Sequence, residues 1–186
     1  MSEALLIVDM QRDVVARIIE NATAVTPNIK KILKAFRKAG KPVVHIARVH
    51  RADGADVELF RLQSFKEKPF LVSGTKGAEF VDDLKPEKGE YVVEKQRFSG
   101  FFQTELQLLL ARLKVDTVVL AGVQTPNCVR ATVVDAIGYD LNTVVLTDAT
   151  GAKTKEIHDA NLLDMRNMGA RMVSTDEYVR EIAGGR

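Results

Sequence analysis

The sequence Ala4-Leu5-Leu6-Ile7-Val8-Asp9 is an unbroken apolar run that ends at a carboxylate. Such a run is typical of a strand buried on both faces of a parallel sheet, because a half-exposed strand would alternate apolar and polar residues. Five further short apolar runs follow along the chain and are predicted to be strands. They span residues 42–47, 91–94, 117–121, 143–146 and 171–173.

Amphipathic segments separate these runs and predict helices. The clearest is expected to begin near Thr26, a residue type that caps helices, with Pro27 in its first turn, and to end before Gly40. Its apolar side chains form one stripe at helical spacing: Ile29, Ile32, Leu33 and Phe36. Further helices are expected at about residues 78–84, near a capping box of Thr104 and Gln107, from about residue 127, at 154–168, and after a capping box of Ser174 and Glu177.

Six strands that alternate with helices predict an α/β fold of three layers, because each crossover must lay its helix on a face of the sheet. We expect a six-stranded parallel sheet of the Rossmann-like, doubly wound kind, with strand order 3-2-1-4-5-6, in a single domain over residues 1–186. Residues 50–89 are charged and irregular, and too long for an ordinary connection. This segment is predicted to be a lid or a contact between subunits.

The composition gives no indication of a nucleic-acid or membrane partner. The net charge is +2, from 27 basic and 25 acidic residues spread along the chain, so neither nucleic acid nor an anionic membrane is an expected partner. Every apolar run is far shorter than the roughly 20 residues that span a bilayer. The single cysteine, Cys128, cannot form an intramolecular disulfide, and no signal peptide is recognisable. We therefore expect a cytoplasmic protein.

Three reactive side chains fall at the carboxyl ends of predicted strands, where ligands bind in such sheets. Asp9 ends the first strand, Lys95 ends the third, and Cys128 lies in the first turn of the helix after the fourth. A helix N-terminus and an ammonium group are expected to lower the pKa of the thiol, and a carboxylate can take its proton. Each residue alone has an ordinary structural explanation: a buried apolar cysteine, a turn-capping aspartate, a solvated lysine.

Three motifs resemble those of the isochorismatase-like cysteine hydrolases, and the resemblance extends over nearly the whole chain. They are Asp9-Met10-Gln11-Arg12-Asp13, Lys95-Gln96-Arg97-Phe98-Ser99 and Gly122-Val123-Gln124-Thr125-Pro126-Asn127-Cys128-Val129, of which the third is the most specific. The resemblance implies a catalytic triad of Cys128, Asp9 and Lys95. It also implies a cis peptide bond between Val123 and Gln124 that directs backbone N–H groups toward the substrate oxygen.

Departures from the family pattern narrow the expected chemistry. Nicotinamidases of this family carry Asp-x-His after the second strand to bind a metal, whereas this chain has Arg48-Val49-His50 there, so we expect no metal. The turn after Asp9 lacks the glycines of a dinucleotide site, so no cofactor is expected. True isochorismatases commonly lack the nucleophilic cysteine, and Cys128 therefore favours acyl chemistry.

The predicted function is a cysteine hydrolase that cleaves a C–N bond of a small amide or carbamoyl-type substrate through a thioester. The alternatives are isochorismatase or nicotinamidase activity and a catalytically silent binding protein on the same fold. Gln11, Arg51 and Phe98 are candidate substrate contacts, and Arg48 and Arg97 are further candidates to bind a substrate carboxylate. Phe101 and Phe102 are candidates to line an apolar pocket. The resemblance implies a homodimer or homotetramer, but neither motif nor composition identifies the physiological substrate.

Overall fold

A computed structural model describes residues 2–17 and 22–184 of the chain. Within these residues, six strands form one parallel sheet in the order β3-β2-β1-β4-β5-β6. The predicted α/β class and strand order are confirmed. The strands are β1 (Glu3–Val8), β2 (Val43–Arg48), β3 (Tyr91–Lys95), β4 (Thr117–Val123), β5 (Asn142–Gly151) and β6 (Arg171–Val173).

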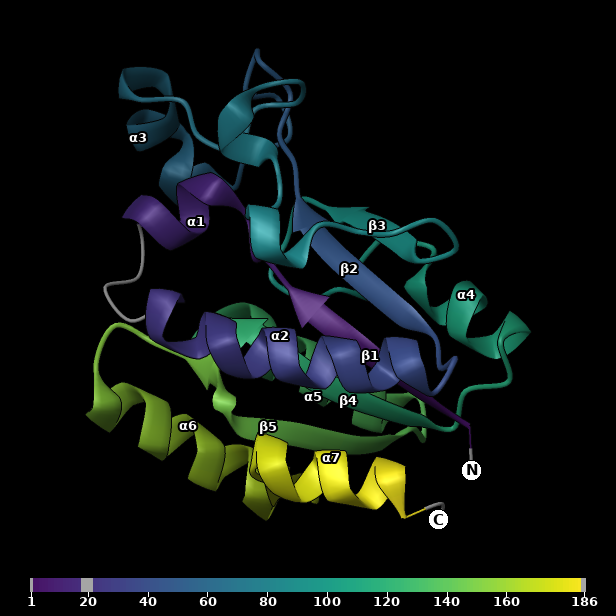
Figure 1. The fold of residues 1–186 in the computed structure, drawn as a ribbon. Coiled ribbons are helices and arrows are strands. Elements are labelled where there is room, and N and C mark those ends of the chain that lie inside the picture. Colours follow the sequence, from purple (N-terminus) through teal and green to yellow (C-terminus); the bar gives the residue numbers. More distant parts are fainter. Residues whose placement is uncertain (1, 18–21, 185–186) are drawn as a thin grey trace.

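Helices cover both faces of the sheet (Figure 1). Alternate residues of β1 enter two separate cores, with Leu5 and Ile7 on one face and Leu6 and Val8 on the other. The first core contains buried side chains of α2 (Ala22–Lys38) and α7 (Thr175–Ala183), and the second contains side chains of α4 (Leu106–Arg112), α5 (Arg130–Gly138) and α6 (Lys155–Asn167). This double burial is why the strand sequence is apolar throughout.

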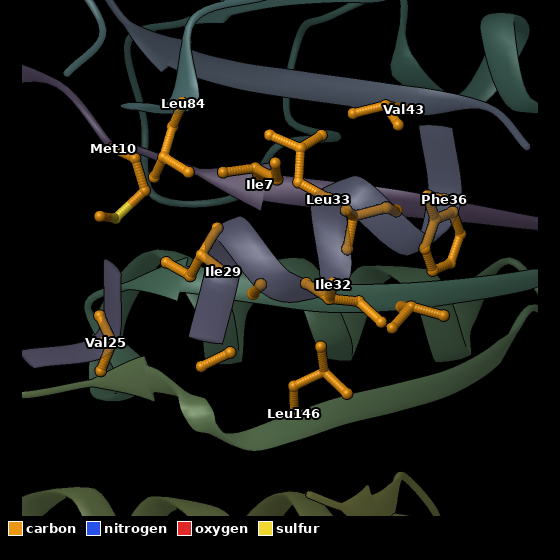
Figure 2. Close-up of a cluster of buried hydrophobic side chains, with 14 of the residues drawn as sticks. Ile7, Met10, Val25, Ile29, Ile32, Leu33, Phe36, Val43, Leu84 and Leu146 are labelled. Carbon is orange, nitrogen blue, oxygen red and sulfur yellow. The ribbon is translucent and has the colours of Figure 1, made fainter. Parts of the chain in front are cut away.

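The stripe of α2 packs onto the sheet as its spacing predicts (Figure 2). Ile29, Ile32, Leu33 and Phe36 are almost completely buried and share a core with Ile7. Full burial of an aliphatic or aromatic side chain stabilises the fold by roughly 1.5–3 kcal/mol. The stripe therefore fixes α2 across the strand that carries Asp9 at its end.

The start of α2 was wrongly predicted. The helix begins at Ala22, before Thr26, and Pro27 lies inside it. The additional turn places Val25 in the same core as Ile29, so apolar burial favours the longer helix. Pro27 is the sixth residue of this helix, so it lies beyond the first turn and removes one internal hydrogen bond. The predicted stop is confirmed, because the helix ends at Lys38 and Gly40 adopts φ +62°.

The segment of residues 50–89 also differs from the expected single helix near 78–84. It contains the short helix α3 (Leu62–Glu67) and the 3-10 turns η1 (Leu59–Arg61), η2 (Lys76–Ala78) and η3 (Asp82–Leu84). Between the last two turns the backbone pairs with the chain that follows β1, since Arg12 N donates to Glu79 O and Val81 N donates to Met10 O. These hydrogen bonds to the chain after β1 take the place of the bonds that a helix over residues 78–84 would make. Figure 1 shows the segment above α1 (Arg12–Arg17).

One of the two predicted capping boxes forms. Ser174 and Glu177 make the reciprocal bonds at the start of α7. The prediction of a capping box at Thr104 and Gln107 is wrong. The helix α4 starts at Leu106, and Thr104 Oγ1 accepts a hydrogen bond from Leu106 N. The helix expected from residue 127 begins as the π-helical turn η4 (Thr125–Val129), which continues into α5. No helix in the described ranges is long and apolar enough to cross a membrane.

Gly122 is required by the contact between β4 and β1. Its φ is +112°, and a Cβ built there would lie 2.2 Å from Val8 O. We predict that Gly122→Ala lowers the free energy of unfolding by about 3 kcal/mol or more, because backbone rather than a side chain must move. Gly89→Ala is the matched control, since Gly89 has φ +96° but no neighbour within 4 Å. It should lose only about 1–2 kcal/mol. Equal losses in urea unfolding would contradict the prediction.

Candidate active site

Asp9 leaves the end of β1 in a conformation that turns the chain. Its φ is +52°, which aspartate tolerates better than most residues. Its N–H donates to Ile46 O at 2.9 Å, so the residue stays attached to β2 while the chain turns away. The side chain is buried. Asp9 therefore lies just after the end of β1, as the sequence predicts, and is shielded from water there.

Lys95 reaches Asp9 across the intervening strand. It ends β3, which pairs with β2, and β2 in turn pairs with β1. Its Nζ donates to Asp9 Oδ2 at 2.9 Å and to Arg97 O at 3.1 Å, and the whole side chain is buried. The long stem of lysine is what spans this distance. The structure thus brings together two of the three reactive side chains as a buried ion pair.

Cys128 lies in the turn η4 between β4 and α5. Gln124 O accepts bonds from Asn127 N at 3.1 Å and Val129 N at 3.2 Å, which shape this turn. Thr132 Oγ1 donates to Cys128 O at 2.7 Å and attaches the turn to α5. The peptide bond between Val123 and Gln124, which precedes the turn, is cis. Cys128 is buried in the hydrophobic core that also contains Val8.

The pKa of Cys128 is raised, and the expectation of a lowered pKa is wrong. Burial is the largest cause, because it disfavours the thiolate, and the charge of Asp9 raises the pKa further. Lys95 and Arg48 act in the opposite direction but do not outweigh these effects. The resting thiol therefore keeps its proton, and a base must remove it during the reaction.

Asp9 supplies a suitable acceptor for that proton. Its Oδ2 is engaged by Lys95, whereas its Oδ1 is buried and makes no hydrogen bond of ordinary geometry within the part of the chain that the structure describes. Asp9 also contributes to the raised pKa of Cys128 as a hydrogen-bond partner of the thiol. The arrangement places a carboxylate oxygen with a free lone pair beside the nucleophile.

The buried pair makes Lys95 important for stability. We predict that Lys95→Met lowers the free energy of unfolding by about 3 kcal/mol, because it leaves Asp9 as a buried carboxylate without its cation. The double variant Asp9→Asn with Lys95→Met should recover most of this loss, since it leaves no uncompensated charge. Urea unfolding of both variants measures the effect. If Lys95→Met were as stable as the parent, the Asp9 carboxylate would not depend on Lys95 for its stabilisation, and the prediction would be wrong.

Arg48 is a further buried cation at the thiol. Its Nη2 lies 3.7 Å from Cys128 Sγ, its Nη1 donates to Glu58, and both side chains are nearly inaccessible. Burial lowers the pKa of Arg48, but the Cys128 thiolate, when it forms, and the charges of Asp9 and Glu58 raise it, so that the net shift is upward. The sequence pointed to Arg48 only as one of several arginines, and it missed Glu58, which comes from the irregular segment and carries no spacing signal.

The other predicted contacts occupy different positions. The Gln11 amide donates to Arg48 O at 2.9 Å and Ala78 O at 2.8 Å, and its oxygen accepts from Arg48 N at 2.8 Å. It therefore holds the backbone of Arg48, and a direct substrate contact from Gln11 stays a prediction. The same holds for Arg51, which is exposed and paired with Asp53 at 2.7 Å.

The phenylalanines separate into three environments. Phe98 lies beside Arg48, whose Cζ is 5.4 Å from the centroid of its ring. Phe101 is buried and packs against Tyr139, with ring centroids 5.3 Å apart, whereas Phe102 is half exposed. Of the three, Phe98 is the one that the structure places at the candidate site.

His50 occupies the place where a nicotinamidase would carry a metal ligand, but its neighbours are of a different kind. Its ring packs edge-on against Phe65 and Phe70, and its Nδ1 lies 3.3 Å from Asp56 Oδ1. His45 is buried and contacts Glu90 at 2.8 Å. Within residues 2–17 and 22–184, no three His, Cys, Asp or Glu side chains gather in a way that suits a metal ion.

A separate hollow of about 830 Å³ lies at the opposite end of the sheet. Glu3, Lys41, Thr117 and Asn142, which stand at or before the amino ends of strands, line it. It contains none of the three reactive side chains. The three reactive side chains lie instead at the carboxyl edge, where ligands bind in doubly wound sheets.

Comparisons with known proteins agree with this fold. The Isochorismatase domain family model matches residues 3–177. A "probable inactive nicotinamidase" of Arabidopsis thaliana is 41% identical, over 97% of this chain and 96% of its own. The maleamate amidohydrolase of Pseudomonas putida is 34% identical, over 81% of this chain and 71% of its own. An isochorismatase family protein from Desulfovibrio vulgaris has a similar structure, with a TM-score of 0.94, 42% identity and 98% of each chain covered. The chain therefore belongs to the isochorismatase family.

Proposed function

We propose that this protein is a cysteine hydrolase that cleaves the C–N bond of a small amide or carbamoyl-type substrate. The observation that carries the proposal is the burial of Cys128, Asp9 and Lys95 in one site, with Lys95 Nζ 2.9 Å from Asp9 Oδ2 and Asp9 acting on the thiol. A nucleophile, a base and an orienting cation are the parts that covalent acyl transfer needs.

The reaction would begin with proton transfer from the Cys128 thiol to Asp9 as Sγ attacks the carbonyl carbon. The resulting oxyanion would be stabilised by backbone N–H groups near Gln124 and Cys128. Collapse of the intermediate breaks the C–N bond, and Asp9 returns the proton to the departing amine or ammonia.

Water then attacks the thioester and gives a proton to Asp9. The thiolate leaves, the carboxylic acid is released, and Cys128 recovers its proton from Asp9. Lys95 orients the carboxylate throughout, because its ammonium group remains bonded to Oδ2. The net reaction consumes one water for each C–N bond broken.

Ammonia release from a panel of small amides, ureido acids and nicotinamide tests the proposal. We expect turnover on at least one amide or carbamoyl compound by the parent and none by Cys128→Ser. Nicotinamide as the sole substrate would favour the nicotinamidase alternative. Saturable binding of panel compounds without hydrolysis would favour a silent binding protein.

We predict that the activity is independent of a metal ion. The position after β2 carries Arg48 and His50, which contact Glu58 and Asp56. Dialysis against a strong chelator should leave turnover unchanged, since the nucleophile is a thiol rather than metal-bound water. Loss of activity that zinc, manganese or iron restores would contradict this prediction. Treatment with the chelator already saturated by calcium is the matched control.

We also propose that the protein assembles as a homodimer or homotetramer. Leu59 and Phe60 are 90% and 69% exposed on the segment beside the active site, and a neighbouring subunit would remove them from water. Light scattering at micromolar concentration should give at least twice the mass of the 20.6 kDa chain. The mass of one chain would count against this assembly.

A further inference from the structure

Arg61 places a half-buried cation at the wall of the active site. It ends η1, and its Cζ lies 5.0 Å from the ring centroid of Phe60 and 5.4 Å from that of Phe98. Among the residues that the structure describes, its guanidinium takes part in no ion pair or hydrogen bond. The other arginines of this region are engaged by protein groups: Arg48 by Glu58, Arg51 by Asp53 and Arg97 by the carbonyl of Asp56.

Phe98 brings this cation together with a second one. Arg48 Cζ is also 5.4 Å from the centroid of the Phe98 ring, so two guanidinium groups share one aromatic side chain. The two arginines repel each other: burial and then the charge of Arg48 are the main causes that lower the pKa of Arg61. A positive charge held close to another in a partly dry site is stabilised by an anion that binds between them.

The charges around the thiol do not balance. Asp9 is paired with Lys95, and Glu58 is paired with Arg48. Arg61 is then the cation left over among these groups while Cys128 keeps its proton. Since one negative charge would compensate this excess, the site is electrostatically suited to a monoanion beside the thiol.

We propose that Arg61, together with Arg48 and Phe98, forms a carboxylate-binding subsite, and that the substrate is a small amide carrying a carboxylate near its scissile carbonyl. A guanidinium recognises a carboxylate through two parallel hydrogen bonds, and Phe98 offers a flat wall for the carbon skeleton. The amide part of this inference rests on the proposed function, whereas the anion subsite rests on the charges alone.

Alkylation of Cys128 tests the subsite without any substrate. Iodoacetate and iodoacetamide both transfer a carbon to the thiolate and release iodide, but only the first carries a carboxylate. Cys128 is the single cysteine of the chain, so the ratio of the two rates reports on this site alone. We expect the iodoacetate to iodoacetamide ratio to be about tenfold higher in the folded protein than in the urea-unfolded chain.

Arg61→Gln should return this ratio to the value of the unfolded chain, and Arg61→Lys should retain part of the preference. Arg112→Gln is the matched control, because it removes one exposed arginine on α4 and changes the net charge equally. Its ratio should equal that of the parent. A parent ratio no higher than that of the unfolded chain, or one that Arg61→Gln leaves unchanged, would overturn the proposal.

A matched pair of substrates extends the test to turnover. The half-amide of a four-carbon dicarboxylic acid and its methyl ester differ only in the carboxylate. Arg61→Gln should lower kcat/KM by about thirtyfold for the acid, mainly through KM, and leave the ester unaffected. Equal hydrolysis of both by the parent would refute the subsite and leave the hydrolase intact. A raised alkylation ratio without hydrolysis of any amide would refute the hydrolase and leave the subsite intact.

Discussion

Cys128→Ser should lower turnover by about a thousandfold or more, while the fold persists. A serine hydroxyl is far less acidic than a thiol, and a carboxylate is too weak a base to deprotonate it readily. The three histidines contact other groups: His50 lies against Asp56, His45 contacts Glu90, and His158 bonds Thr125 Oγ1 and Thr147 O. The substitution changes the volume of the side chain little, so packing around η4 should be retained.

Turnover on a substrate found in the amide panel, followed at saturating concentration, measures this effect. Mass spectrometry after rapid quenching should detect an acyl adduct on the parent and none on Cys128→Ser. Ser99→Ala, which changes a buried hydroxyl in the loop after β3, controls for general disturbance near the site. Activity of Cys128→Ser within about tenfold of the parent, or about 1.4 kcal/mol in the barrier, would refute a covalent cysteine mechanism.

Asp9→Asn should change turnover and thiol reactivity in opposite directions. Turnover should fall by about a thousandfold, because an amide cannot accept the thiol proton or return it to the leaving amine. Alkylation of Cys128 by iodoacetamide at neutral pH should become faster. Asp9 raises the pKa of the thiol, and its loss frees the Lys95 ammonium to stabilise the thiolate.

The expected increase in the alkylation rate of Cys128 makes this test specific for the role of Asp9. In the parent, the raised pKa means that the alkylation rate keeps increasing as pH rises past the ordinary thiol range, and Asp9→Asn should move this profile to lower pH. Asp159→Asn, an exposed aspartate on α6, should leave both profiles unchanged. If Asp9→Asn slowed alkylation in proportion to turnover, Asp9 would support the structure of the site instead of acting as its base.

The sequence by itself determined the architecture. Runs such as Ala4–Val8 are apolar throughout because both faces of each strand are covered, and the spacing of Ile29, Ile32, Leu33 and Phe36 is the spacing of one helix face. These are properties of single elements, and they repeat along the chain. Because parallel strands end at one edge, the placement of Asp9, Lys95 and Cys128 at a common edge follows from the same pattern.

Tertiary structure alone decided how these groups act. Lys95 reaches over β2 to bond Asp9, Glu58 pairs with Arg48, and Arg61 finds no ionic partner among the described residues. These outcomes depend on distances between elements, which periodicity does not encode. The same is true of the Cys128 pKa. A helix start and a lysine predict a lowered value, but burial raises it, and burial is the sum of all neighbours that the folded chain packs around the thiol.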